Sequence, residues 1–304
     1  MYNDLREKTL TAPQKVASDL EVEKFRLMKK IIVPIDFSEH SEYALEAAAM
    51  LAQKYGAEIL ALHMLEISDV ILTQKNADQQ AKAFFLLKLA EQKFESFLDK
   101  DYLKGLTVKP VVKHFKVFSE VNDVAKEHNV DLIVMGSHGA SGVKEFLVGS
   151  NTEKVVRYAE VPVLVVKHNP ILMDFEKVVF ACDFSEEAIE PYLKATELFK
   201  TIGSTVHLVY VNLPNVGYKS TAEMEKRVAE FLKKAHGSLE KMSDVSYVCD
   251  YSVEKGILNF SNVIGADLVA VATHGRTGLA HFFEGSITED LANHSTLPVM
   301  TFKI

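Results

Sequence analysis

Cysteine is scarce in this chain, and no part of it is apolar enough to span a membrane. The two cysteines, Cys182 and Cys249, fall in separate predicted strands and form no Cys-x-x-Cys pair, so neither a zinc site nor a redox pair is indicated. No apolar run approaches the roughly 20 residues that a membrane helix needs. The first 27 residues are charged and polar, unlike a signal peptide. These absences predict a cytoplasmic protein without a membrane partner.

The chain has no net positive charge, and it also lacks the common enzyme motifs. The chain carries 34 Lys and Arg against 42 Asp and Glu, which gives a formal charge of −8 and a pI near 5.8. A general nucleic-acid binder needs a basic face, so we expect no nucleic-acid partner, while a local basic site could still hold one nucleotide. The P-loop, the Gly-x-Gly-x-x-Gly fingerprint and the Gly-x-Ser-x-Gly elbow are absent. Their absence argues against a P-loop ATPase, a dehydrogenase and a typical hydrolase.

The most informative stretch that is present runs from Asp131 to Glu153. Residues 132–135 form a short apolar run of the kind that a buried parallel strand shows. A loop punctuated by glycines follows, with Gly136, Gly139 and Gly142. The loop closes on Gly149 and Ser150, where a helix is predicted to begin. Because the N–H groups and the dipole at a helix N-terminus suit an anion, this stretch predicts a phosphate site.

A purely structural interpretation of the same stretch is available, since Ser150 and Glu153 have the spacing of a capping box. The stretch occurs twice, however. Residues 267–289 repeat it with an offset of 136 (267 − 131), and the second copy contains Gly275, Arg276, Gly285 and Ser286. Capping and anion binding are compatible, and the repetition favours a binding function.

Strands and helices alternate along two similar halves of the 304-residue chain. The predicted strands are Lys30–Ile35, Ile59–Leu65, Val108–Phe115, Leu132–Gly136 and Val163–Val166, then Lys177–Cys182, Val206–Val211, Val245–Tyr251, Leu268–Ala272 and Val299–Phe302. Helices are expected from Ser38 to Gly56, along the apolar stripe from Ala83 to Phe97, at Glu120–Asn129 and Ser150–Ala159, then from Glu186, around Met224–Leu232, at Val253–Ile264 and after Gly285. Such alternation forces parallel strands with helices on both faces. We therefore predict an α/β fold of two doubly wound domains, residues 28–168 and 169–304, preceded by an N-terminal extension of residues 1–27.

Two acidic residues follow the first strand of each half. Asp36 and Asp183 begin identical Asp-Phe-Ser tripeptides, offset by 147 (183 − 36). Each carboxylate could accept hydrogen bonds from a ribose or base at the carboxyl edge of the sheet, or could cap the turn that follows. In the glycine loops, Lys144 and Arg276 could reach phosphates as cations. His138 and His274 have no evident partner or substrate, so we interpret them as loop residues rather than general bases.

Taken together, these residues resemble a known family. The pattern Gly-x-x-Gly-x9-Gly-Ser from Gly136 to Ser150, preceded by Val-Pro-Ile-Asp at residues 33–36, is similar to the ATP-binding subclass of universal stress proteins. The resemblance extends from about Met28 onward as two tandem copies. It implies a five-stranded parallel sheet of order 3-2-1-4-5 in each half, and a cytoplasmic stress-response protein that binds ATP, ADP or AMP, with Mg²⁺ as an optional companion. It also implies that the halves pair through their last strands as an internal pseudo-dimer, with further homo-oligomerisation open.

The resemblance and the repeat nominate one set of nucleotide-binding residues in each half. These are Pro34, Asp36, Gly136, Gly139, Gly149, Ser150 and Asn151 in the first half, and Asp183, Gly275, Arg276, Gly285 and Ser286 in the second. No residue is assigned to catalysis or to a metal. We favour a regulatory module over two alternatives, a slow nucleotide hydrolase that uses Asp36 and Mg²⁺ and a scaffold that binds no nucleotide. Because Ala272 replaces Gly136 in the second copy, we expect the second site to be weaker, with Arg276 softening the loss.

Overall fold

The residues that the structure describes form ten strands, five in each half. A computed structural model describes residues 28–65, 77–114, 120–138, 149–170, 173–214, 217–273 and 291–304. The first half contributes β1 (Lys30–Pro34), β2 (Glu58–Leu65), β3 (Val108–His114), β4 (Leu132–Gly136) and β5 (Val163–Val166). The second half contributes β6 (Lys177–Ala181), β7 (Thr205–Asn212), β8 (Val245–Cys249), β9 (Leu268–Thr273) and β10 (Val299–Lys303).

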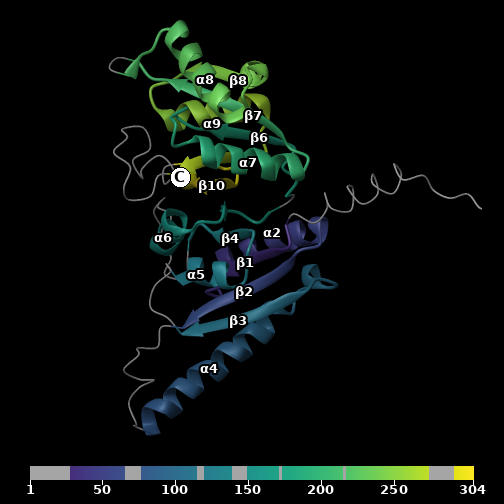
Figure 1. Cartoon of the computed structure of the whole chain (residues 1–304). Helices are drawn as coiled ribbons and strands as arrows, with labels where there is room; N and C mark the ends of the chain where they lie inside the picture. Colours follow the sequence, from purple (N-terminus) through teal and green to yellow (C-terminus); the bar gives the residue numbers. More distant parts are fainter. Residues whose placement is uncertain are drawn as a thin grey trace, which may run out of the picture.

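All ten strands join in one sheet of order β3-β2-β1-β4-β5-β10-β9-β6-β7-β8 (Figure 1). Within each half the pairs are parallel and the order is 3-2-1-4-5, so the predicted α/β fold is confirmed. The halves meet where β5 and β10 pair antiparallel, with Met300 opposite Leu164. We call this junction of β5 and β10 the seam.

The helices start and stop largely where local chemistry places them. They are α2 (Glu39–Tyr55), α4 (Ala77–Leu98), α5 (Glu120–Glu127), α6 (Ser150–Tyr158), α7 (Ile189–Thr201), α8 (Thr221–His236) and α9 (Val253–Ile264), with short 3-10 turns η1 (Asp101–Leu103) and η3 (Glu240–Asp244). At the start of α2 the Ser38 side chain accepts the Ser41 N–H, as an N-cap does. At its end Gly56 adopts φ 70°, a left-handed conformation that glycine tolerates. None of the helices that the structure describes is long and apolar enough to cross a membrane.

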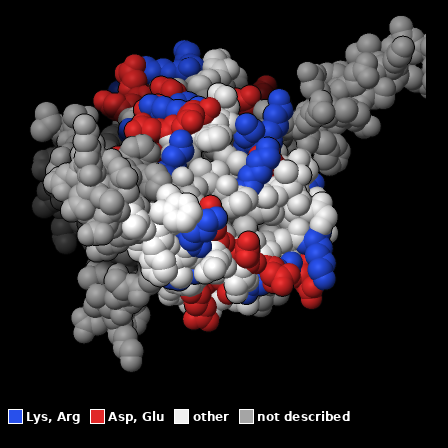
Figure 2. All heavy atoms as spheres, turned by 90° about the horizontal axis from the view of Figure 1, so that it is seen from below, with Lys and Arg blue, Asp and Glu red and all other residues white. Residues whose placement is uncertain are grey.

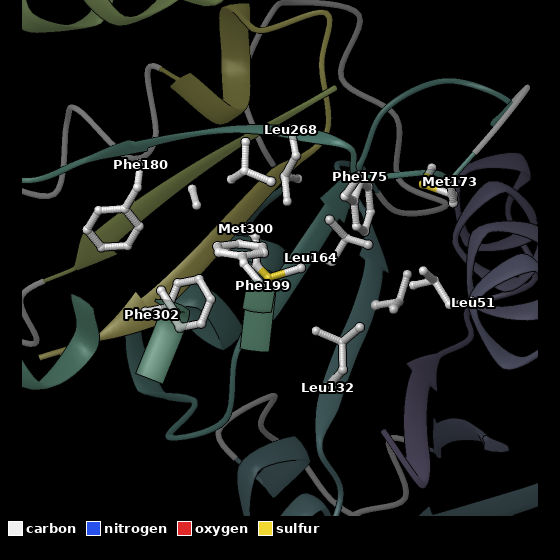
Figure 3. Close-up of a cluster of buried hydrophobic side chains, with 14 of the residues drawn as sticks. Leu51, Leu132, Leu164, Met173, Phe175, Phe180, Phe199, Leu268, Met300 and Phe302 are labelled. Atoms are coloured by element: carbon white, nitrogen blue, oxygen red, sulfur yellow. The ribbon is translucent and has the colours of Figure 1, made fainter. Parts of the chain in front are cut away.

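Alternate side chains of each strand enter different cores. In β4, Leu132 and Val134 pack in a core with α2, α7 and α8, whereas Ile133 and Met135 pack on the opposite face with α5 and α6. On the second half's opposite face, α9 covers a third core. The α2 side is continuous across the seam, since Leu164 of β5 and Met300 of β10 belong to one apolar cluster (Figure 3). Helices thus cover both faces of the sheet, and the two halves share a core on one of them.

One predicted helix cap and one predicted helix start are wrong, although α6 begins at Ser150 as predicted. Ser150 is not the N-cap of α6, because Gly149 occupies that position without a side-chain hydrogen bond. The Glu153 carboxylate that a capping box would use accepts instead from Arg157, at 2.6 Å. Helix α7 begins at Ile189 rather than Glu186, because a separate turn precedes it, in which the Ile189 N–H donates to the Glu186 carbonyl at 3.2 Å. The start of the helix predicted after Gly285 lies outside the described residues, and residues 291–294 are helical.

The surface carries acidic and basic side chains in mixed groups. On the face seen from below in Figure 2, they surround a paler area of uncharged residues, without a continuous basic field. Many of them pair, for example Lys126 with Glu160 at 2.6 Å.

Candidate functional site

A hollow opens at the carboxyl ends of β1, β2 and β4 in the first half. In the sheet β1 lies between β2 and β4, with Ile31 opposite both Ile59 and Leu132. Here the strand order reverses, which is where ligands bind in sheets of this type. The hollow has a volume of about 630 Å³ when its opening to solvent is included.

Most of the residues predicted for the first half come together around this hollow. They are Pro34, Asp36, Gly136, Gly149, Ser150 and Asn151. Gly139 and Lys144 lie outside the described residues. Apolar side chains from the strand ends, Leu62, Met64 and Met135, also line it. The hollow therefore has an acidic group, an apolar wall and the start of a helix.

Asp36 caps the turn that follows β1, which is one of the two roles that the sequence left open. Its Oδ1 accepts the Ser38 N–H at 3.0 Å and the Ser38 hydroxyl at 2.5 Å, so it closes the turn that leads into α2. Between them Phe37 has φ 63°, an uncommon conformation for a bulky residue. The Phe37 ring lies 4.6 Å from the ring of His63 and 5.3 Å from that of Phe94. Aromatic packing thus holds a strained turn in which the Asp36 carboxylate borders the hollow.

His63 is a lining residue that sequence reasoning missed. Its Nδ1 lies 2.7 Å from the Ile35 carbonyl oxygen, which can only accept, so Nδ1 carries the proton. Burial lowers the pKa of His63 below its ordinary value. The neutral ring fixes the end of β1 just before Asp36. The position of His63 near the end of β2, opposite the end of β1, was the available signal.

The N-terminus of α6 supplies main-chain donors, although not all those expected. We predicted Gly149 as a donor to phosphate, but its N–H donates to the Ser137 carbonyl at 2.8 Å. The first helical bond runs from the Glu153 N–H to the Gly149 carbonyl, at 3.0 Å. The N–H groups of residues 150–152 precede this ladder, and they are the groups that a helix N-terminus offers to an anion.

Thr152 ties this helix end to the sheet. Its hydroxyl donates to the Gly136 carbonyl at 2.8 Å, and the residue is 3% exposed. The sequence offered no sign of this bond, since it joins a helix to the strand before the glycine loop. Thr152 fixes the start of α6 against the end of β4.

Gly136 is needed for packing rather than for an unusual backbone. Its φ is not positive, so a left-handed backbone at this position is no reason to expect weaker binding where Ala272 replaces it. A Cβ at this position would lie 2.6 Å from the His40 carbonyl oxygen. The residue that matches His40 in the second half, Glu187, precedes α7. Ala272 is accordingly accommodated there, buried at 1% exposure.

Two histidines lie close together beside the hollow. The rings of His40 and His138 have centroids 5.1 Å apart, and Nδ1 of His138 lies 2.9 Å from the Ser137 hydroxyl. Ser137 is only 1% exposed, so its hydroxyl is poorly placed to attack a ligand. No group of three His, Cys, Asp or Glu side chains within the described ranges is arranged to hold a metal ion.

The matching region of the second half differs at the same positions. The Asp183 Oδ1 accepts the Ser185 N–H at 2.9 Å, as in the first half, but Oδ2 lies 3.8 Å from the Arg227 guanidinium. Tyr210 replaces His63 and stacks on Phe184, at 5.5 Å between centroids. The described residues line a smaller hollow at this position, of about 350 Å³ with its opening to solvent included. Gly275, Arg276, Gly285 and Ser286 lie outside the described residues, as does His274.

Cys182 lines this smaller hollow, but its thiol is not reactive. Burial raises the pKa of its thiol to about 12, so the reactive thiolate does not form near neutral pH. Neither Cys182 nor Cys249 forms a disulfide.

Comparison with known proteins places the geometry in context. Residues 28–167 and 174–303 each match the model of the universal stress protein family. The chain is similar to Universal stress protein Slr1230 of Synechocystis, 25% identical over 91% of this chain and all of that protein. It is also similar to Universal stress protein MJ0577 of Methanocaldococcus jannaschii, 31% identical over 46% of this chain and 96% of that one. The crystal structure of a universal stress protein from Archaeoglobus fulgidus superposes with a TM-score of 0.60 and 25% identity, over 92% of this chain and 97% of that one.

Proposed function

Because the chain belongs to the universal stress protein family, we propose that it is a cytoplasmic regulatory module of stress adaptation that binds an adenine nucleotide in its first half. The observation that carries this proposal is the hollow between β1 and β4, where Asp36 and the start of α6 lie on one cavity. Nucleotide occupancy would change which partner the module binds.

The lining fits a nucleotide in three parts. The N–H groups of residues 150–152 and the positive end of the α6 dipole suit phosphate oxygens. The Asp36 carboxylate suits the hydroxyl groups of a ribose, and the apolar side chains of Pro34, Leu62 and Met64 suit the flat face of a base. Mg²⁺ would accompany the phosphates when ATP is bound.

Binding is favoured over hydrolysis by the nature of the polar groups. Asp36 is the one carboxylate among the lining residues that the structure describes, and it already closes the turn at Ser38. Ser137 and His138 pair a hydroxyl with a base, but Ser137 is buried, so its hydroxyl is poorly placed to attack a ligand. A general base needs a reacting proton within reach.

The decisive experiment is calorimetry on the full chain with ATP, ADP, AMP and adenosine, followed by a turnover assay on the same sample. We expect saturable binding and turnover no faster than the uncatalysed rate. Gly149→Val is the matched variant, because φ −58° and ψ 141° at Gly149 are open to any residue. It should fold and lose affinity for the phosphorylated ligands. Failure of the parent to bind any of them would favour the scaffold, and steady turnover would favour the hydrolase.

The two domains are further proposed to act as an internal pseudo-dimer. The antiparallel pairing of β5 with β10 and the apolar cluster shared across the seam support this, because a hydrophobic junction keeps two domains from moving independently. Solution scattering should fit one rigid particle. A distribution of separated halves would refute the arrangement.

The two sites are proposed to be unequal, with the first the tighter. Arg227 lies near Asp183, and the hollow beside Asp183 is the smaller one. Because the halves share a core, the test uses the full chain with Asp36→Ala and Asp183→Ala. The first substitution should reduce ATP affinity more. A larger loss from Asp183→Ala would reverse the ranking.

A further inference from the structure

Two lysines cross the seam in equivalent ways. The Lys303 amine donates to the Tyr158 carbonyl at 3.4 Å, and the Lys167 amine donates to the Asn293 carbonyl. The lysines are offset by 136 residues (303 − 167), the offset of the glycine repeat. Each therefore reaches from one half to the carbonyl end of the last helix of the other.

Tyr158 is the last residue of α6, the helix whose first residues line the hollow. The last carbonyls of a helix have no partner within it, and they carry the negative end of its dipole. A lysine charge at this end is favourable. One helix thus has the proposed phosphate site at its N-terminus and a lysine from the other domain at its C-terminus.

The lysine charge acts on its surroundings at this helix end. Glu160, two residues beyond α6, has a pKa below its ordinary value, mainly because of the Lys126 amine and in smaller part because of Lys303. The backbone of Lys303 is fixed in β10 opposite Thr273, and the next N–H, of Ile304, donates to the Thr273 carbonyl at 2.8 Å. The amine is therefore held by the rigid sheet of the second half.

Nine residues of α helix span about 14 Å at roughly 1.5 Å per residue. Over this length a helix moves as a rigid rod, so holding its last turn also orients its first. Thr152 holds the other end against the Gly136 carbonyl. We infer that Lys303 of the second domain is a positioning residue for the nucleotide site of the first, acting through the C-terminus of α6. This inference rests on the proposed function, and it concerns the phosphates rather than the base.

The test compares Lys303→Met, which keeps the apolar stem and removes the charge, with the control Arg157→Met. Arg157 is in the last turn of α6 and pairs with Glu153 of the same helix, so it does not cross the seam. Calorimetry on the full chain measures affinity for ATP and for adenosine. Lys303→Met should weaken ATP binding about two- to fivefold, as a charge at a helix end does, and should leave adenosine binding within twofold. Lys303→Arg should restore ATP binding, and Arg157→Met should leave the ratio of the two affinities near that of the parent.

Thermal melting without nucleotide accompanies each variant. An equal loss for ATP and adenosine in Lys303→Met would mean that the lysine supports the fold only, and this would overturn the inference. The same ratio change in Arg157→Met would overturn it too, because the effect would then not depend on the seam. If the parent binds neither ATP nor adenosine, the proposed function itself is wrong. If the parent binds both and Lys303→Met leaves the ratio of the two affinities unchanged, only the inference about Lys303 is wrong.

Discussion

Replacing Gly136 by Ala is a sharp test of how the first domain is packed. The added Cβ would lie 2.6 Å from the His40 carbonyl oxygen, 2.7 Å from the His40 carbonyl carbon and 2.8 Å from its Cβ. Two of these atoms belong to the backbone of the first turn of α2, so no change of rotamer relieves the contact. Either α2 or β4 has to move.

The size of the effect follows from these distances. Ordinary van der Waals contact starts at 3.4 Å, so the two segments must separate by about 0.8 Å (3.4 − 2.6). Overpacking of this kind costs about 1–3 kcal/mol, which raises the unfolded fraction about 5- to 150-fold at roughly 1.4 kcal/mol per factor of ten. Since Ser41 of the same turn lines the hollow, the displacement should also weaken nucleotide binding.

Urea unfolding and calorimetry measure the two consequences. For the unfolding measurement the control is Gly149→Ala, because the backbone at Gly149 is open to any residue and the two variants add the same methyl group. We expect a lower midpoint for Gly136→Ala with an unchanged slope. Ala272 shows that the second half accommodates a Cβ at the matching position. If Gly136→Ala is as stable as the parent, the first half accommodates the Cβ as well, and the packing argument is wrong.

Three further variants or measurements test individual side chains. Asp36→Asn keeps an acceptor for the Ser38 N–H but removes the charge, so affinity for ATP should fall about tenfold while stability is preserved. An unchanged dissociation constant in calorimetry would contradict a role of Asp36 in binding. Burial lowers the pKa of His63, so the unfolded chain binds a proton more readily and stability should decline as the pH falls below about 6.5. Urea unfolding at pH 5 and 7.5 should show a smaller decline for His63→Gln than for the parent. An equal decline in both proteins would exclude His63 as its source. Burial also lowers the pKa of Lys167 to about 8, so its methylated amine should titrate near pH 8 by NMR, and a value near 10.5 would mean that the amine is hydrated.

Elements bounded by strong local signals could be predicted from the sequence. β4, β5 and α9 have the predicted bounds, because short apolar runs or a Ser cap and a closing Gly define them. Gly265, which ends α9, adopts φ 62° as such a position requires. These features depend on neighbours in the chain.

The start of α7 could not be predicted in this way. Ser185 follows Asp-Phe as Ser38 does, yet its hydroxyl is buried without a hydrogen-bond partner among the described residues, whereas Ser38 caps α2. The difference lies in distant contacts. Glu186 pairs with Lys234 of α8 at 2.7 Å, and Arg227 of the same helix approaches Asp183. Identical tripeptides therefore lead into helices that begin at different distances.

The candidate site was predicted in outline and misjudged in detail for the same reason. The sequence identified Asp36, Gly136 and the start of α6 as neighbours, because parallel strands bring their carboxyl ends to one edge. It could not indicate that Gly136 accommodates His40, or that the Gly149 N–H is already bonded to Ser137. Both contacts join segments that meet only in the folded sheet.

The two halves agree at the seam and differ at the site, and this contrast bears on how the protein works. At the seam, Lys167 and Lys303 make equivalent contacts, and β5 and β10 pair with each other. At the carboxyl ends of the strands, by contrast, the described residues of the second half line a smaller hollow, and Arg227 lies 3.8 Å from the Asp183 carboxylate. The proposed nucleotide site and the proposed role of Lys303 together describe a division of roles between the domains. In this division the first domain binds the nucleotide, and Lys303 of the second domain holds the C-terminus of α6 in place.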